Sequence, residues 1–347
     1  MTPPPRIDLR SDTVTRPSPA MRRAMADAEV GDDVLDRDPT TRRLEERVAE
    51  LLGMDDALFF PSGTQANQTA VALLAHPGTE LVLDANAHLV HYELAGVAAN
   101  WGVQIRPVAT GDGVLTGQLV RAALRAPSPH LPRTGAVAVE NTHNAAGGKV
   151  MAPDVMDGIV AAARAGGGVP VHVDGARLWN AAAALRLPPA RLVRGAATVM
   201  VSLSKGLGCP VGSCLAFATA VVERARAWEI RKRLGGGMRQ SGILAAAGLY
   251  ALEHNLARVF EDHDNARLLA ERLLDCAAVR VSAPESNIVM IDLVQERDTA
   301  DAIVPKLAHA GVLVAPFGER RLRAVTHLDV SRADVMRAAE VIVSALG

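Results

Sequence analysis

The stretch VMVSLSKGLGCPVGS (residues 199–213) places one lysine between an apolar run and a series of small residues. The apolar run predicts a buried β-strand, and the glycines after Lys205 predict a loop at the end of that strand. Lys and Arg together number 37, but only four of them are lysines: Lys149, Lys205, Lys232 and Lys306. Arginine stays charged, whereas a desolvated lysine can become neutral and attack a carbonyl carbon. This stretch therefore predicts a strand with a reactive amine at its carboxyl end.

The same pattern, a short apolar run beside a helical stretch, recurs along the first two thirds of the chain. The runs are ALFF (57–60), ELVLDA (80–85), VQIRPVA (103–109), AVAVEN (136–141), VPVHVDG (169–175), TVMVSLS (198–204) and SCLAFA (213–218). Apolar runs that alternate with helices are typical of a mostly parallel sheet buried on both faces. The sequence therefore predicts an α/β fold whose large domain contains a mostly parallel seven-stranded sheet.

Helical segments flank these runs. DPTTRRLEERVAELLG (38–53) predicts a helix that Asp38 caps and Gly53 ends. From about residue 221 the pattern is strongly helical, and after a long predicted helix come short strands and a closing helix, which indicate a smaller α/β domain. We expect an N-terminal segment over 1–14, a large domain over 15–248 and a C-terminal domain over 249–347.

Composition narrows the class of protein. The formal net charge is −1, hydrophobic residues make up 49% and charged residues 22%, as in ordinary soluble enzymes. The sequence has no long basic run, so nothing indicates a nucleic-acid or membrane partner. Three cysteines are too few for a disulfide framework, and the first residues lack the apolar stretch of a signal peptide. We therefore expect a cytoplasmic protein.

Polar residues follow five of the predicted strands. They are Ser62-Gly63-Thr64, Asp84 to His88, Glu140 to His143, Asp174 to Arg177, and Ser204-Lys205. Loops collect polar residues for solubility, so each group alone is weak evidence. Because ligands of open parallel sheets bind at the carboxyl ends of the strands, five such groups together predict a ligand site.

Three of these groups suggest a particular chemistry. Ser62-Gly63-Thr64 at a strand-to-helix turn suits a phosphate, although a plain helix cap would look the same. Asp174, just past a buried strand, needs a cation, which could be a protonated pyridine nitrogen or simply Arg177. Lys205 could be an ordinary surface lysine, but the strand before it and the glycines after it indicate burial.

Two other kinds of site are not indicated. His88 and His91 are three residues apart, but no H-E-x-x-H motif or Cys/His cluster accompanies them, so we expect no metal. No G-x-G-x-x-G motif follows an early strand, so a nicotinamide dinucleotide site is not predicted either.

Taken together, the motifs resemble those of the low-specificity L-threonine aldolases, pyridoxal 5'-phosphate (PLP) enzymes with the aspartate-aminotransferase fold (fold type I). The resemblance covers nearly the whole chain. It runs through IDLRSDTVTRPSPAMRRAMADAEVGDD, PSGTQANQ, VENTHNAAGGKV, VHVDGARLWNA, SLSKGLGCPVGS, RLGGGMRQSGILAAAGL and RAVTHLDVSRADV. A chain of this family is expected to cleave L-threonine or L-allo-threonine to glycine and an aldehyde.

The resemblance also implies roles for individual residues. Lys205 would bind the cofactor covalently, Asp174 would pair with its ring nitrogen, and Gly63 and Thr64 would hold its phosphate. His88 would stack on the cofactor ring, and His143 would lie near the substrate hydroxyl. The substrate carboxylate would be held by Ser11, Arg177 and Arg323, with Arg177 also close to the cofactor. Lys232 and Arg239 would reach the phosphate from a neighbouring subunit, since the implied assembly is a homotetramer built as a pair of dimers.

Some alternatives stay open at this level. The chain has Leu35-Asp36-Arg37 where many members have Tyr-Gly-Glu, so a hydroxyl near the cofactor or the subunit contact is missing. A β-eliminating lyase or a racemase would use the same cofactor, and a non-catalytic cofactor-binding protein would keep the lysine without turnover. The sequence does not separate threonine from allo-threonine or from bulkier β-hydroxy amino acids.

Overall fold

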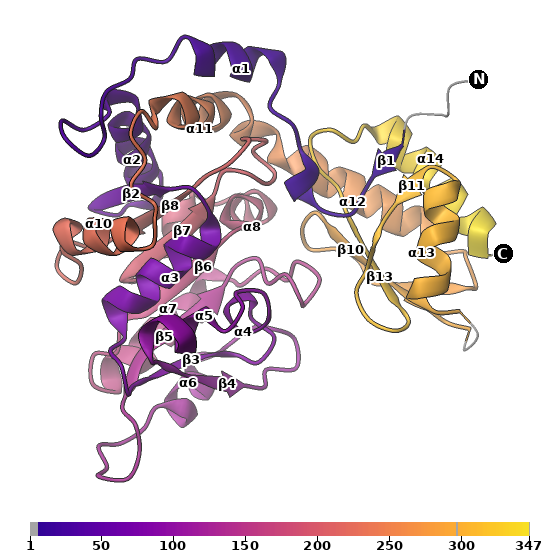
Figure 1. Ribbon diagram of the computed structural model, residues 1–347. Coiled ribbons are helices and arrows are strands. Elements are labelled where there is room, and N and C mark those ends of the chain that lie inside the picture. Colours follow the sequence, from indigo (N-terminus) through magenta and orange to yellow (C-terminus); the bar gives the residue numbers. More distant parts are fainter. Residues whose placement is uncertain (1–5, 296–297, 347) are drawn as a thin grey trace.

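The computed structural model describes residues 6–295 and 298–346, and its centre is a seven-stranded sheet (Figure 1). The sheet has the order β2-β8-β7-β6-β5-β3-β4, and in it only β8 runs antiparallel to its neighbours. The strands are β2 (Asp56–Phe60), β3 (Glu80–Asp84), β4 (Gln104–Val108), β5 (Thr134–Glu140), β6 (Val171–Gly175), β7 (Thr198–Ser202) and β8 (Ser213–Phe217). All seven predicted runs are strands of one mostly parallel sheet, so this prediction is confirmed.

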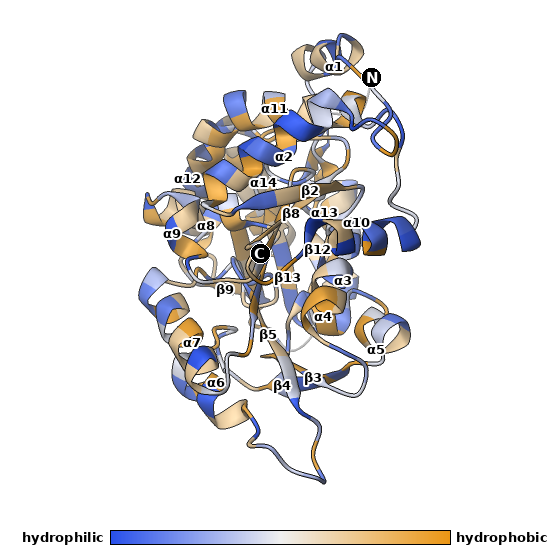
Figure 2. Ribbon diagram, turned by 90° about the vertical axis from the view of Figure 1, so that its left-hand side faces the viewer, coloured by the Kyte–Doolittle hydropathy of each residue, from blue (hydrophilic) through white to orange (hydrophobic). Residues whose placement is uncertain are grey.

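Each face of the sheet has its own hydrophobic core, because successive side chains of a strand point to opposite faces. On β2, Phe59 belongs to the core under α2 (Pro39–Leu52), α7 (Pro153–Ala165), α8 (Leu178–Leu185) and α11 (Gly242–His254). Its neighbours Leu58 and Phe60 belong to the core under α3 (Gly63–Leu74) and α10 (Arg224–Arg233). Figure 2 shows hydrophilic residues on the outer helices α2 and α10. The sheet is therefore covered by helices on both faces.

The helix predicted over 38–53 forms as α2. The Asp38 carboxylate accepts a hydrogen bond of 2.8 Å from the backbone N–H of Thr41, which satisfies a free donor of the first turn. Gly53 ends the helix with φ of 61°, a left-handed conformation that glycine adopts without strain.

A second unit has its own core and contains the C-terminal part of the chain (Figure 1). Its four-stranded antiparallel sheet consists of β9 (Val279–Val281), β10 (Ile288–Leu293), β12 (Ala315–Pro316) and β13 (Arg321–Val325). α12 (Val259–Leu273), α13 (Ala300–His309) and α14 (Arg332–Leu346) pack with it. The N-terminal strand β1 (Ile7–Asp8) pairs with β11 (Val312–Leu313), so residues from both ends of the chain build this unit.

The single long helix expected between the two units is not present. α11 ends at His254, a short 3₁₀ turn (Leu256–Arg258) follows, and α12 begins at Val259. At the break, the Asn255 side chain donates a 2.8 Å hydrogen bond to the carbonyl of Leu207, in the loop that carries Lys205. α11 packs on α2 and α12 packs on α14, which favours a boundary at 255–258 over one at 248/249 inside α11. The division into domains stays a prediction.

Among the described residues, no helix combines the length and apolar character that crossing a bilayer would require.

One buried carboxylate on α12 predicts a pH dependence of stability. Asp262 is 1% exposed, neither of its carboxylate oxygens has a hydrogen-bond partner among the described residues, and the nearest Arg258 nitrogen is 4.0 Å away. Burial raises the pKa of Asp262 from its ordinary 3.8 to about 7. Between these pH values the folded chain keeps a proton that the unfolded chain releases, so stability falls as pH rises through this window.

We expect Asp262→Asn to remove most of this pH dependence, because an amide cannot titrate. The whole shift corresponds to about 4 kcal/mol in the free energy of unfolding, of which the part above pH 5 contributes about 2.7 kcal/mol. Urea unfolding at pH 5 and pH 8, at one protein concentration, measures the slope for both proteins. An equal loss of stability between the two pH values in the variant would assign the effect to other groups.

Candidate active site

Lys205 opens onto a cavity of about 240 Å³ at the carboxyl ends of the central strands. It follows β7 by three residues and lies in the short loop that leads to the antiparallel strand β8. The residues around the cavity come from four strand ends and the first turns of α3. They are Pro61, Ser62, Gly63, Thr64, Asn67, His88, Asp174, Ala176, Met200, Ser202, Ser204, Lys205, Pro210 and Val211. The structure thus brings together five of the residues predicted from the sequence: Lys205, Asp174, His88, Gly63 and Thr64.

The surroundings of Lys205 favour a neutral amine. Burial lowers the pKa of Lys205, and the nearby guanidinium of Arg177 lowers it further. The loop around it is held in place, since the Thr15 hydroxyl donates a 2.9 Å hydrogen bond to the Lys205 carbonyl. A lowered pKa makes the neutral, nucleophilic form of the amine easier to reach, which is the property expected from its position after a buried strand.

The first turn of α3 forms one end of the cavity and suits an anion. The Ser62 side chain caps the helix by accepting from the N–H of Gln65 at 3.2 Å, while the hydroxyl of Thr64 is close by at the helix start. A side chain on Gly63 would lie 3.4 Å from the Ser213 hydroxyl, which is buried and lacks a partner among the described residues. Free backbone amides, hydroxyl groups and the positive end of the helix dipole are what a phosphate requires.

Asp174 is a buried carboxylate whose direct hydrogen-bond partners among the described residues are all neutral. It is 2% exposed and accepts hydrogen bonds from Asn67 Nδ2 (2.8 Å) and from the backbone N–H of Ala176 (3.1 Å). In the described part of the chain it forms no ion pair, because Arg177, the alternative partner suggested by spacing, binds Asp12 instead. A buried carboxylate with neutral partners is costly unless a ligand supplies a cation.

These groups fit a cofactor with a phosphate, a protonated ring nitrogen and a carbonyl carbon. The phosphate would be held at Ser62, Gly63 and Thr64, the ring nitrogen at Asp174, and the carbonyl carbon at Lys205. The observation that supports this fit is that Asp174 forms no ion pair with the described residues and borders the cavity.

His88 lies on the wall of the same cavity, at the start of α4 (His88–His91). Its backbone N–H donates to Glu140 Oε2 (2.9 Å), and its ring Nδ1 lies 3.0 Å from Glu93 Oε1. Burial alone would lower the pKa of His88, but the carboxylates of Glu93, Asp174 and Glu140 outweigh it and raise the pKa. The structure therefore gives the cavity an imidazole that can hold a proton.

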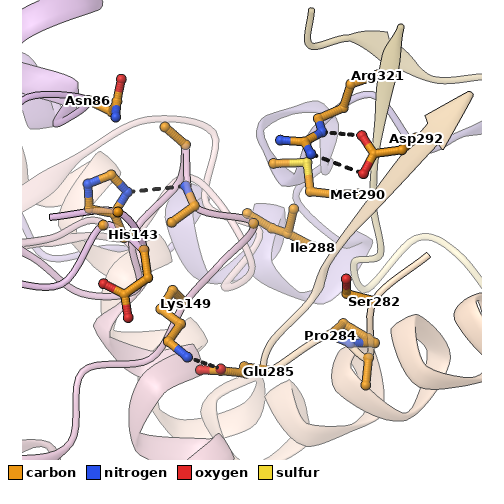
Figure 3. Close-up of a pocket in the computed structure, with 17 residues that line it drawn as sticks. Asn86, His143, Lys149, Ser282, Pro284, Glu285, Ile288, Met290, Asp292 and Arg321 are labelled. Atoms are coloured by element: carbon orange, nitrogen blue, oxygen red, sulfur yellow. Dashed lines mark hydrogen bonds and ion pairs between the residues drawn. The ribbon is translucent and has the colours of Figure 1, made fainter. Parts of the chain in front are cut away.

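His143 lies elsewhere. It is 1% exposed, its Nε2 is 3.1 Å from Asp84 Oδ1, and its Nδ1 accepts a hydrogen bond of 3.2 Å from the N–H of Ala146. It lines a different cavity, of about 450 Å³, whose far wall contains Met290 of β10 (Figure 3). His143 and Lys205 thus do not border one cavity, and a role for His143 at the substrate hydroxyl stays a prediction.

Arg177 and Arg323 meet where the two units of the fold come together. Arg177 is the N-cap residue before α8 and Arg323 lies on β13, and both donate to Asn144 Oδ1, at 3.3 and 2.8 Å. Asp12 binds Arg177 through two hydrogen bonds of 2.7 and 2.8 Å, and Arg323 lies over the Phe317 ring at 5.0 Å. Two guanidinium groups that share one neutral amide oxygen repel each other, so a further anion there would be stabilised.

The remaining predicted residues are positioned less directly. Ser11 accepts hydrogen bonds from the Thr13 N–H (3.2 Å) and hydroxyl (2.9 Å) and so caps a 3₁₀ turn beside Asp12. Lys232 and Arg239 are exposed and do not line the Lys205 cavity, and Arg239 Nε lies 3.2 Å from Asp32. The roles of these three residues stay predictions.

Four residues at or next to the site were not singled out from the sequence: Asp12, Asn67, Glu93 and Asn144. Asn67 could have been found, because it is four residues after Gly63 on a predicted helix and so points to the same side. The other three act through contacts between segments far apart in the chain, which a single sequence does not display.

Comparisons with known proteins agree with this geometry. A family model described as β-eliminating lyase matches residues 8–296. The low-specificity L-threonine aldolase 1 of Arabidopsis thaliana is 42% identical over 338 residues, covering 95% of this chain and 93% of that protein. The solved structure of a Leishmania major threonine aldolase has a TM-score of 0.83 at 19% identity, covering 98% of this chain and 100% of that chain.

A further solved structure, described as SPT with PLP, has a TM-score of 0.74 at 19% identity. It covers 98% of this chain and 87% of that chain. The predicted fold, a seven-stranded mostly parallel sheet with a smaller α/β unit, is therefore confirmed as the fold that these structures share.

Proposed function

The chain belongs to the β-eliminating lyase family, and from that premise we propose that it is a low-specificity L-threonine aldolase. It is a PLP-dependent carbon–carbon lyase that cleaves L-threonine or L-allo-threonine to glycine and acetaldehyde. The observation that carries the proposal is the cavity shared by Lys205, the unpaired Asp174 and the start of α3.

The residues of that cavity would divide the work of holding the cofactor. Lys205 would bind it covalently, Asp174 would keep its ring nitrogen protonated, and Gly63 and Thr64 would bind its phosphate. PLP supplies an electron sink that stabilises the negative charge left on the α-carbon when one of its bonds breaks. Which bond breaks is decided by the protein.

Arg177 and Arg323 would select the bond that is cleaved, because they would fix the orientation of the substrate by binding its carboxylate. Their positions support this role, since two guanidinium groups converge on one amide oxygen at the junction of the two units. A carboxylate held at two points cannot rotate freely, so the Cα–Cβ bond can be kept in the orientation that favours its cleavage. Orientation of this kind can supply several kcal/mol of the barrier.

His88 is the candidate group for the proton of the β-hydroxyl. It lines the cavity that contains Lys205, whereas His143 lines another cavity. As the Cα–Cβ bond breaks, the hydroxyl oxygen becomes the aldehyde oxygen and its proton passes to a base, here His88 Nε2. The second product, glycine, gains a proton at its α-carbon.

Product analysis tests the proposed reaction. We expect L-threonine or L-allo-threonine to yield glycine and acetaldehyde in equal amounts, and D-threonine to be inert. Alcohol dehydrogenase coupling measures acetaldehyde, and chromatography measures glycine. The main product 2-oxobutyrate would indicate the β-eliminating alternative, D-allo-threonine formed from L-threonine would indicate a racemase, and no turnover would indicate a binding protein.

We also propose that the enzyme is a homotetramer in which a second subunit completes the phosphate site. Exposed Lys232 and Arg239 on one chain support this, as do the exposed apolar residues Leu35 (73%) and Leu94 (95%), which a partner would cover. Lys232→Ala should weaken PLP binding roughly tenfold, as a lost contact to phosphate would. Fluorescence titration with PLP and sedimentation velocity test both parts, and a fully active monomer would exclude them.

A cytoplasmic location, expected from the composition, stays a prediction.

A further inference from the structure

Glu93 is a buried carboxylate directly behind His88. It follows α4, its side chain is 0% exposed, and its Oε1 lies 3.0 Å from His88 Nδ1. One side-chain nitrogen or oxygen atom from each of His88, Glu93 and Asp174 lies within 4.8 Å of the other two. Because an ionised carboxylate can only accept hydrogen bonds, His88 Nδ1 is the donor in this contact. The nitrogen left for the cavity is Nε2.

A chain of hydrogen bonds holds Glu93 itself. Its Oε1 also accepts from Asn67 Nδ2 at 2.9 Å, and its Oε2 accepts from Gln68 Nε2 at 2.7 Å. The oxygen of the same Gln68 amide, Oε1, accepts a hydrogen bond of 3.1 Å from Trp101 Nε1. Every one of these donors is neutral, so they place the carboxylate without cancelling its charge.

The orientation of the Asn67 amide follows from its neighbours. Its Nδ2 donates to both Glu93 and Asp174, while its Oδ1 lies 3.1 Å from His172 Nε2. Burial lowers the pKa of His172 to about 4, so this imidazole is neutral, and because Asn67 turns its oxygen toward Nε2, that nitrogen is the donor. A rotated Asn67 would point its oxygen at two carboxylates, which is unfavourable. Asn67 thus joins Glu93 to the carboxylate expected at the cofactor ring.

The backbone after Glu93 adopts a conformation that is unfavourable for its residues. Leu94 and Ala95 have φ of 52° and 58°, in the left-handed region that costs non-glycine residues roughly 1 kcal/mol or more each. Next to them, a side chain on Gly96 would come within 2.9 Å of Gln68. The chain therefore turns sharply where Glu93 must point inward, and it leaves space for the residue that holds Glu93.

The charges around His88 make Glu93 its closest ionic partner. The titratable groups that face His88 are Glu93 and Tyr92 after α4, Glu140 at the end of β5, Asp174 at the end of β6 and Lys205 across the cavity. Glu140 binds the His88 backbone and not its ring. In the described part of the chain, His88 is the one ion-pair partner of Glu93, so Glu93 contributes directly to stabilising a protonated His88.

We propose that Glu93 is a positioning residue for His88, holding Nδ1 so that Nε2 is presented to the β-hydroxyl of the substrate. The inference rests on the proposed function, because it names the nitrogen that takes the hydroxyl proton. Glu93 itself touches neither the cavity nor the substrate. It acts through His88.

The protonation of His88 can be measured without turnover. In the PLP-loaded enzyme with ¹⁵N-labelled histidine, we expect the neutral His88 ring to carry its proton on Nδ1, with His88→Phe identifying the signal. In Glu93→Gln the pKa of His88 should fall, because a neutral amide no longer stabilises the imidazolium. The same spectra of the cofactor-free protein should show the same direction. A wild-type His88 protonated on Nε2, or a pKa unchanged in the variant, would overturn the proposal whatever the products are.

Kinetics separate charge from position. Glu93→Gln should lower kcat/KM roughly 10- to 100-fold and move the acidic limb of its pH profile to lower pH. Glu93→Asp keeps the charge but is one methylene shorter, so it should lower kcat/KM while the acidic limb stays near its wild-type position. If Glu93→Gln does not fold, the tautomer of His88 in the wild-type enzyme and the pH profile of Glu93→Asp still test the proposal.

Trp101→Phe is the matched control, since it removes the outermost of the hydrogen bonds that link Trp101, Gln68 and Glu93. It should leave both the His88 signal and the pH profile unchanged. If Trp101→Phe changed the pKa of His88 and the pH profile as much as Glu93→Gln does, this series of hydrogen bonds would have only a structural role. That result would overturn the proposal.

Discussion

Lys205→Ala is expected to abolish covalent attachment of the cofactor and to lower kcat for threonine cleavage by at least about 10³-fold, as loss of a nucleophile does. The reason is local. The amine lies at the end of a buried strand, burial lowers its pKa, and the loop around it is held through Thr15. Borohydride reduction followed by peptide mapping should find PLP on the peptide that contains Lys205.

Lys149→Ala is the matched control, because that lysine is half-buried, lies outside the Lys205 cavity and is ion-paired with Glu285 at 2.6 Å. It should keep both the label and the activity. Label on Lys149, Lys232 or Lys306 in the wild-type enzyme would show that the assignment of Lys205 is wrong.

Asp174→Asn is expected to keep the fold and to lower kcat by roughly 10²- to 10³-fold. Asn67 and the Ala176 N–H donate to different oxygens of Asp174, so the single amide oxygen of asparagine keeps one of these hydrogen bonds, and the equal size of the two side chains preserves the fold. What is lost is the negative charge, and a neutral amide stabilises a protonated ring nitrogen poorly. Each factor of ten in rate corresponds to about 1.4 kcal/mol of barrier.

The comparison for Asp174→Asn is Asp157→Asn, which removes a carboxylate from a surface pair with Arg191 and Arg194. That variant should be fully active, since surface ion pairs contribute little. Steady-state kinetics and thermal unfolding of both variants test the claim. Near-normal turnover in Asp174→Asn, with PLP bound, would refute the proposed role of Asp174.

The sheet was predictable because each strand is an apolar run with clear ends. Phe59, Val82 and Val199 alternate with residues of the opposite core, as two-sided burial requires. The reversal of β8 was not predictable, since a buried strand has the same pattern in both directions. The break at Asn255 was missed for a different reason: no glycine or proline marks it, and the side chain that defines it binds a carbonyl about 50 residues earlier in the chain.

The candidate site was predictable where chemistry coincides with a strand end. Lys205, Asp174 and His88 all follow apolar runs, and the structure brings them to one cavity. The sequence could not indicate that Asp12 would bind Arg177, because the two are 165 positions apart and each had a closer possible partner. Nor could it indicate that His143 would turn toward Asp84, since that depends on how one loop packs against β10.

Residues 7–15 connect the two units of the fold by hydrogen bonds to both of them. The N–H groups of Ile7 and Leu9 donate to Gly311 and Leu313, and Leu9 accepts from Val325, all within the C-terminal unit. A few residues later, Asp12 and Thr15 bind Arg177 and the Lys205 loop of the large unit. For protein engineering, this means that residues 7–15 are a poor target for libraries that aim at new aldehydes. Val211, which is 37% exposed at the cavity wall, is not one of the residues that connect the two units, so it can be varied without removing those hydrogen bonds.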